Sequence, residues 1–168
     1  MSLQTKAIPI VIDANVLLAF YLPAEPYKIE ALTLLGEVTK GQVRLVVPTL
    51  TRYEVLNVLS RITRKLKKGQ ELSMPDAQEI LTAIEALKLE EHEVQGLGER
   101  ILEIAHKHQC SVYDAAYLAL AEQIKADFLT GDERFYKALK GQFKQVKFID
   151  DYEAREDEVK LDKRKNKV

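Results

Sequence analysis

One stretch of the chain, residues 111–135, constrains the fold more than any other, because it combines a helix, a buried strand and two carboxylates. Its sequence is SVYDAAYLALAEQIKADFLTGDERF. Ser111 can cap the helix, and Asp114 lies three residues later, where its carboxylate can reach back to the N–H of the cap. Capping is therefore the simplest interpretation of Asp114. The small residues that follow predict a helix face that packs closely on a neighbouring layer.

The strand after this helix ends at a second carboxylate. Residues 126–130 form a short apolar run closed by Gly131, which is typical of a buried strand in a parallel sheet, and Asp132 follows its C-terminal end. Sites in open α/β sheets form at that edge. Two carboxylates that meet there repel each other unless a cation lies between them. A cation site would need further carboxylates at the same edge.

Two earlier segments supply such carboxylates. Residues 7–12 predict a central strand that ends at Asp13, and a helical pattern begins soon after Asn15. Either Asp13 or Asn15 could instead cap that helix. Residues 43–47 predict a second strand, and Glu54 lies in the amphipathic helix that follows and runs to about Leu66. Helix periodicity alone predicts that Glu54 is solvated or pairs with Arg61.

Alternating strands and helices predict one α/β domain over residues 1–150, followed by a charged tail over residues 151–168 that is a mobile helix or a disordered arm. The helix expected over residues 27–39 has an apolar stripe predicted to face the core. Its members are Ile29, Leu32, Leu35 and Val38.

Composition excludes several classes of protein. The chain has 168 residues, 46% of them hydrophobic, which is sufficient for a core. Its single cysteine precludes an intrachain disulfide framework, and it has no apolar run long enough to span a membrane, so we expect a soluble cytoplasmic protein. A net charge of -1 gives no general attraction to nucleic acid, which would have to be bound by local basic patches.

The densest basic patch follows the helix that carries Glu54. It is either a solvated face or a contact for the phosphates of RNA, and its members are Arg61, Arg64, Lys65, Lys67 and Lys68. The three histidines lack the spacing of a zinc site, and no phosphate-binding glycine loop follows a strand. Metal chemistry, if present, therefore depends on carboxylates.

Four carboxylates on a common edge would make a site of hard oxygen ligands, which suits Mg²⁺ or Mn²⁺. Two such ions can activate water and stabilise the leaving oxygen of a phosphoryl displacement, without a Ser, Cys or His nucleophile. The candidates are Asp13, Glu54, Asp114 and Asp132.

Four segments in the chain resemble the signature segments of PIN domains, and are most similar to the VapC-type ribonuclease toxins. They are VIDANVLLA at residues 11–19, EVLN at 54–57, SVYDAAYLALA at 111–121 and FLTGD at 128–132. The resemblance implies a three-layer α/β/α sandwich with a central parallel sheet, and an endoribonuclease activity that depends on Mg²⁺ or Mn²⁺. It also implies an RNA substrate, a small VapB-like antitoxin that covers the acidic groove, and a homodimer.

The same resemblance implies roles for individual residues. Asp13, Glu54, Asp114 and Asp132 would form the catalytic quartet, and Asp13 and Asp114 would be the principal metal ligands, joined by Asp132. Asn15 and Thr130 would be polar supports that orient a carboxylate or a water.

Two other functions remain open at this point. A strand that ends in Asp13 could present an aspartyl-phosphate nucleophile, but Asn15 occupies the place of the expected second aspartate. A PIN-like module that binds RNA or protein outside a toxin–antitoxin system, with little or no cleavage, is the non-enzymatic alternative. Retention of four mutually repelling acids argues against it.

Overall fold

A five-stranded parallel sheet forms the centre of the molecule. The computed structural model describes residues 7–139 and 141–155. The strand order is β3-β2-β1-β4-β5, and each neighbouring pair is parallel. The strands are β1 (Ile8–Ile12), β2 (Val43–Pro48), β3 (Glu90–His92), β4 (Asp127–Thr130) and β5 (Val146–Phe148). The predicted central parallel sheet is confirmed.

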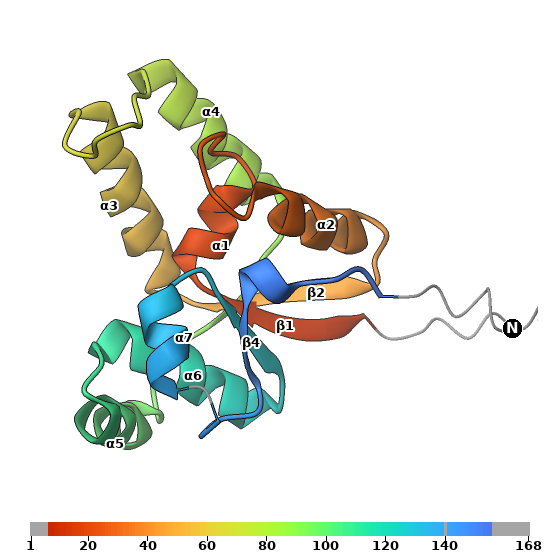
Figure 1. Cartoon of the computed structure of the whole chain (residues 1–168), viewed down its shortest axis with the longest axis vertical. Coiled ribbons are helices and arrows are strands. Elements are labelled where there is room, and N and C mark those ends of the chain that lie inside the picture. Colours follow the sequence, from red (N-terminus) through yellow and green to blue (C-terminus); the bar gives the residue numbers. More distant parts are fainter. Residues whose placement is uncertain (1–6, 140, 156–168) are drawn as a thin grey trace, which may run out of the picture.

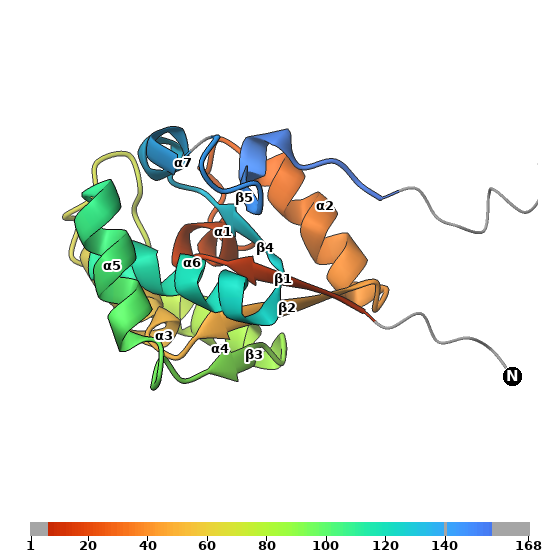
Figure 2. The same ribbon diagram turned by 90° about the horizontal axis from the view of Figure 1, so that it is seen from below.

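Helices cover both faces of the sheet (Figures 1 and 2). They are α1 (Ala14–Ala19), α2 (Lys28–Thr39), α3 (Thr51–Thr63), α4 (Met74–Ala86), α5 (Gly98–His108), α6 (Val112–Ile124) and α7 (Glu133–Leu139). Ile10 and Ile12 of β1 join one core with residues of α1 to α4, whereas Val11 joins a second core with α5, α6 and α7. The alternation of side chains along β1 thus separates two cores, and the predicted three-layer α/β/α sandwich is confirmed.

The strand order places a natural site beside β1. The chain leaves β1 for β2 on one side, and β4 lies on the other side, so the direction of winding changes between β1 and β4. Ile12 is in register with Leu129, so these two strands end at nearly the same level. Crevices at such switch points are where open α/β sheets bind their ligands. Asp13 follows β1 directly, and Asp132 lies two residues beyond β4.

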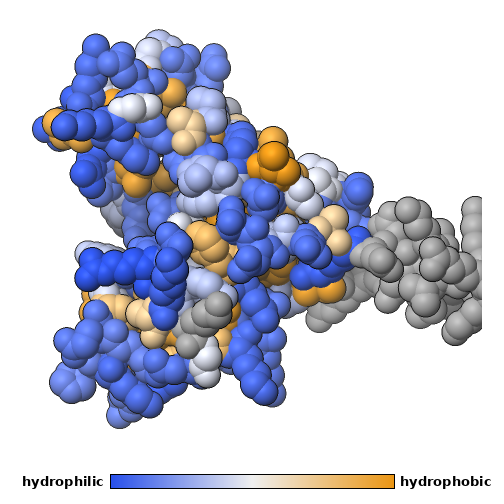
Figure 3. Space-filling model, in the orientation of Figure 1, coloured by the Kyte–Doolittle hydropathy of each residue, from blue (hydrophilic) through white to orange (hydrophobic). Residues whose placement is uncertain are grey.

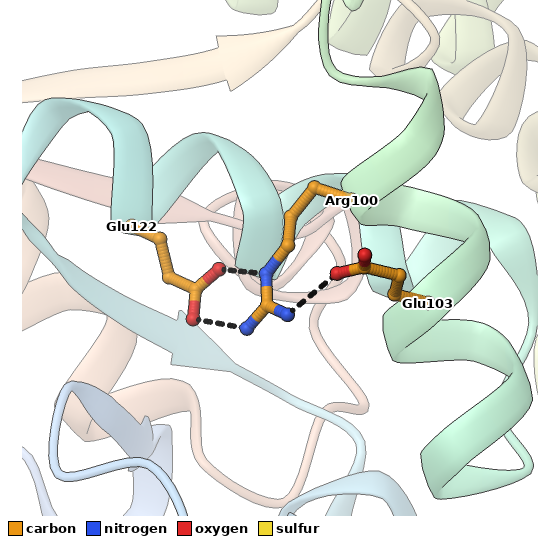
Figure 4. A network of polar contacts seen from close by, with 3 residues as sticks. All are labelled: Arg100, Glu103 and Glu122. Carbon is orange, nitrogen blue, oxygen red and sulfur yellow. Dashed lines mark hydrogen bonds and ion pairs between the residues drawn. The ribbon is translucent and has the colours of Figure 1, made fainter.

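Helix α6 lies on the sheet because its inner face is made of small and apolar residues. Ala115, Ala119 and Ala121 are buried, and the helix packs on β1 and β2. Outside it, Arg100 of α5 binds Glu122 of α6 through two hydrogen bonds of 2.8 and 2.9 Å, and Glu103 through one of 3.0 Å (Figure 4). The two carboxylates raise the pKa of the Arg100 guanidinium. This exposed network sets the position of α5 on α6 more than it adds stability.

The apolar stripe expected on α2 was wrong for two of its four members. In α2, Ile29 is 76% exposed and Leu32 is 46% exposed, whereas Leu35 and Val38 are partly buried and pack against the core. The helix instead buries Ala31, Leu34 and Glu37.

The helix expected to run to about Leu66 is shorter: α3 ends at Thr63 and the chain turns at Lys65, whose φ is 56°, which leaves Leu66 exposed. A residue beyond that turn no longer lies on the buried stripe of the helix.

The chain continues past residue 150 along α2. A short 3₁₀ turn, η1 (Ile149–Asp151), buries Ile149, and Tyr152 packs against the same core as α2. The buried carboxylate of Glu37 accepts hydrogen bonds from the Tyr152 hydroxyl and from the Arg155 backbone N–H, the latter at 2.7 Å. Residues 151–155 therefore lie on the domain. The rest of the predicted tail, residues 156–168, is outside the described residues.

Within residues 7–139 and 141–155, none of the helices combines the length and apolar character needed to cross a membrane.

Candidate active site

Asp13 is the most buried carboxylate at the switch point, with 7% of its surface exposed. One oxygen accepts from the Val16 N–H at 2.9 Å, so Asp13 caps α1, one of the two roles that the sequence left open for it. The other accepts from the Thr130 hydroxyl at 2.6 Å and from the Gly131 N–H at 3.0 Å. Burial outweighs these bonds and raises the pKa of Asp13 to about 6.

Thr130 joins the ends of β1 and β4. Its hydroxyl donates to Asp13 and accepts from the Asp132 N–H at 3.0 Å. The Asp132 carboxylate accepts from the Phe135 N–H at 2.9 Å, which fixes it at the start of α7. Thr130 is fully buried, so its hydroxyl cannot turn to water. These contacts are those expected of a residue that orients a carboxylate.

Asp114 lies in the first turn of α6, which Ser111 caps. The Ser111 hydroxyl accepts from the Asp114 N–H at 3.1 Å and donates to the Asp114 carboxylate at 2.7 Å. Burial raises the pKa of Asp114, and the nearby charge of Asp132 raises it further. The serine cap therefore holds Asp114 beside another carboxylate.

Glu54 is neither fully solvated nor paired with Arg61. It is half-buried in the first turn of α3 and accepts a hydrogen bond from the Tyr117 hydroxyl of α6. The Thr51 hydroxyl is hydrogen-bonded to the same Tyr117 hydroxyl, at 2.9 Å. Burial raises the pKa of Glu54, and the charges of Asp13 and Asp114 add to the shift. The expectation from helix periodicity failed because it contained no information about α6.

The four carboxylates form one electrostatic group. The charge of Asp114 raises the pKa of Asp13, both of these raise the pKa of Glu54, and Asp132 raises that of Asp114. They come from four places in the chain: the end of β1, the start of α3, the start of α6 and the turn after β4. Figure 3 shows that the surface is hollowed between the part built from α3 and α4 and the part built from α5, α6 and α7.

The donor set fits a hard divalent cation in its chemistry. All four groups are carboxylates, and their mutual repulsion and burial favour neutralisation by a cation. Across the part of the chain that the structure describes, however, no three His, Cys, Asp or Glu side chains are close enough together to hold a metal ion. A cation would have to draw these carboxylates inward or complete its shell with water, as Mg²⁺ usually does.

The other predicted residues differ in their distance from this group: Asn15 adjoins it, whereas the basic residues lie away from it. Asn15 is exposed on α1, with its Cβ facing Gly131. The basic residues lie at the other end of α3 from Glu54, where Figure 1 shows the α3–α4 connection projecting away from the sheet. Lys65 lies 3.9 Å from Glu71 there. A role of Arg61, Arg64, Lys65 and Lys68 in RNA binding stays a prediction.

Three residues that shape the site were not predicted from the sequence. Tyr117 orients Glu54, and its position three residues after Asp114 was a signal, because such residues share a helix face. Tyr27 lies beside Gly131, and burial together with the charges of Asp13, Glu25 and Asp132 raises its pKa. Thr51 is buried against Tyr117. No sequence pattern indicated the contacts of Tyr27 or Thr51.

The model of the PIN domain family matches residues 10–140, which is most of the chain. The chain belongs to the PIN domain family. Among curated relatives, ribonuclease VapC3 of Pyrobaculum aerophilum is 31% identical over 125 residues, covering 74% of this chain and 90% of that protein. Ribonuclease VapC9 of Mycobacterium tuberculosis is 36% identical over 91 residues, covering 54% of this chain and 67% of that protein.

Solved structures share the PIN fold. PAE2754 from Pyrobaculum aerophilum superposes with a TM-score of 0.63 at 20% identity, covering 87% of this chain and 88% of that one. A toxin–antitoxin complex from Klebsiella pneumoniae gives a TM-score of 0.57 at 16% identity, covering 83% of this chain and 97% of that one. These two likenesses support the fold alone.

Proposed function

We propose that this PIN domain protein is a VapC-type endoribonuclease that hydrolyses RNA phosphodiester bonds with the help of Mg²⁺ or Mn²⁺. The observation that carries the proposal is the convergence of four carboxylates from separate elements on the switch point of the sheet. Relatives named as VapC ribonucleases support the reaction class. The catalytic residues would be Asp13, Glu54, Asp114 and Asp132.

Asp13, Asp114 and Asp132 would hold the metal. When bound, such an ion lowers the pKa of a water and stabilises the leaving oxygen of the phosphodiester. The chain's own contribution is orientation. Thr130 and Gly131 direct one oxygen of Asp13, and Ser111 directs Asp114.

Glu54 would accept a proton from the attacking water. Its raised pKa suits that role, and Tyr117 fixes one of its oxygens.

The same proposal extends to partners. We propose a VapB-like antitoxin as partner of this chain, because curated relatives are named VapC ribonucleases; a protein of the same fold from Klebsiella pneumoniae was solved in a toxin–antitoxin complex. We further propose a homodimer in the cytoplasm, as the resemblance to VapC-type toxins implies. The competing function is an RNA-binding or protein-binding PIN module outside a toxin–antitoxin system.

The first test is the melting temperature of the wild type and of Asp114→Asn, each in EDTA and in Mn²⁺. Removing one repelling charge should raise the metal-free melting temperature, and the variant should lose most of the Mn²⁺ shift. A ligand at 100 times its Kd stabilises the folded state by about 2.7 kcal/mol, so the wild-type shift should span several degrees.

Asp76 provides a matched control. Ser73 caps α4 and Asp76 occupies the same place in its first turn as Asp114 does in α6. Asp76→Asn should melt lower than the wild type and keep the full Mn²⁺ shift. If Asp114→Asn behaves like Asp76→Asn, Asp114 is only a helix cap and the metal site is wrong. Metal-dependent RNA cleavage by the wild type then separates the nuclease from a binding module.

A further inference from the structure

A second feature adjoins the acidic group: a depression of about 260 Å³ between the end of α5 and α7. Asp114 and Asp132 form part of its wall, so it opens onto the proposed catalytic group. The lining also includes His108 and Gln109 at the end of α5 and Arg134 of α7. Its volume lies just below the about 300 Å³ at which pockets begin to enclose a small organic ligand, which suits a phosphate and its sugar.

Arg134 is the cation of this depression. It is exposed in the first turn of α7, and within the described residues it has no ion-pair partner. Lys137, three residues further along α7, is held by Glu133 at 2.6 Å. A guanidinium presents several N–H donors in a fixed plane that matches the oxygens of a phosphate. The Arg134 guanidinium is therefore free to bind a phosphate that enters the depression, close to the carboxylates of Asp114 and Asp132.

The residues that line the depression at the end of α5 are held in place by local contacts. His108 packs its ring edge-on against Phe143, with ring centroids 5.1 Å apart. Gln109 ends α5 with a φ of 52° and donates its side-chain N–H to the His106 carbonyl at 2.7 Å. These contacts fix two lining residues before a ligand binds, which lowers the cost of ordering them on binding.

We propose that this depression binds the nucleotide next to the scissile bond, with Arg134 contacting its phosphate. The inference rests on the proposed ribonuclease function and adds a substrate-binding residue to it. Arg134 would act by binding and not by chemistry. Its loss should weaken binding of substrate and transition state alike, which raises KM and leaves kcat unchanged.

The kinetic test compares Arg134→Gln with Lys137→Gln, two equal charge changes on one helix. With single-stranded RNA in Mn²⁺, Arg134→Gln should raise KM about ten-fold, equivalent to about 1.4 kcal/mol, while kcat stays within about two-fold. The slope of log(1/KM) against log salt should fall by about 0.7, the share of one phosphate contact. Lys137→Gln should change neither quantity. An equal KM in both variants overturns the inference and leaves the ribonuclease function intact.

A second measurement does not depend on cleavage. Cys110 lines the same depression and is the only cysteine of the chain, so its alkylation rate reports on occupancy. At a concentration that slows alkylation about three-fold in the wild type, a mixture of ribonucleoside 5′-monophosphates with Mg²⁺ should act equally on Lys137→Gln and should slow alkylation of Arg134→Gln only about 1.2-fold, as a ten-fold weaker affinity requires. Absence of protection in the wild type, or equal protection in all three proteins, contradicts the subsite even if no RNA substrate has been found.

Discussion

At the scale of single residues, Asp13 shows how burial and hydrogen bonding compete. Three hydrogen bonds favour its ionised form, yet its removal from water raises its pKa to about 6. A group that is costly to ionise in the free protein gains most from a cation. The site is thus less stable without metal than its hydrogen bonds alone suggest.

The pH dependence of stability follows from this shift. The folded protein binds a proton on Asp13 up to about pH 6, whereas the unfolded chain releases it near 3.8, so this contribution is full below pH 4 and is lost as pH rises through 6. In EDTA, Asp13→Asn should therefore gain stability relative to the wild type by up to about 3 kcal/mol between pH 4 and 7. Urea unfolding of both proteins measures the difference.

Only the pH-dependent part of that difference is diagnostic, because the amide also changes the hydrogen bonds to Thr130 and Gly131 by a constant amount. A difference that does not vary from pH 4 to 7 would mean that Asp13 is ionised throughout and that its hydrogen bonds outweigh burial.

Sequence located the carboxylates but not their surroundings. Asp13 and Asp132 were predictable because each follows a buried strand, and parallel strands end on one edge. Asp114 was recognisable as part of a helix cap. Its proximity to Asp132 was predictable because Asp132 follows the strand that comes directly after the same helix. The partner of Glu54 was not predictable, because Tyr117 is 63 residues away in the sequence and meets it only once α6 has packed on the sheet.

At the scale of elements, the turn from β4 to α7 brings the site together. Gly131 donates to Asp13, and it lies where a Cβ would meet the Tyr27 hydroxyl and approach the Asn15 Cβ to 2.9 Å. A glycine is needed here because of close approach. The sequence showed only that Gly131 closes a strand, since the atoms that crowd it belong to α1 and to the segment before α2.

Gly131→Ala should consequently destabilise the protein by about 1–3 kcal/mol, the usual cost of overpacking, and should reduce cleavage by displacing the donor to Asp13. Gly36 is a suitable control, because it lies inside α2 and a Cβ added there would have nothing within 4 Å. Gly36→Ala should stabilise by about 0.5–1 kcal/mol. Chemical denaturation ranks the two variants, and a neutral Gly131→Ala would show that Tyr27 can move aside freely.

Helix α2 shows where periodicity fails. The large apolar residues Ile29 and Leu32 suggested the inner face, but the helix turns Ala31 and Leu34 toward the core. A neighbouring sheet accepts small residues at close distance, and size alone does not identify the buried side. Glu37 lies on that buried side, which no hydrophobic pattern could have indicated.

At the scale of the whole molecule, Glu37 joins helix α2 to the C-terminal segment of the domain. It lies near the end of α2, is 3% exposed, and receives the Tyr152 hydroxyl and the Arg155 N–H from the segment that follows the last strand. Figure 2 shows this segment running beside α2. A boundary at residue 150 stays a prediction, but cutting there would strip a buried carboxylate of its donors.

A chain that ends at residue 151 should thus be less stable than the full chain by about 3 kcal/mol or more, because a buried charge that loses its partners is costly.

The Glu37→Leu substitution separates this effect from the general loss of contacts. In the full chain the substitution should destabilise, since it leaves the Tyr152 hydroxyl and the Arg155 N–H without their acceptor. In the shortened chain it should restore stability by removing the unpaired carboxylate. Urea unfolding of the four proteins gives the coupling between Glu37 and residues 152–168. Additive effects would mean that the segment is held by apolar packing of Tyr152 and that Glu37 contributes nothing to its docking.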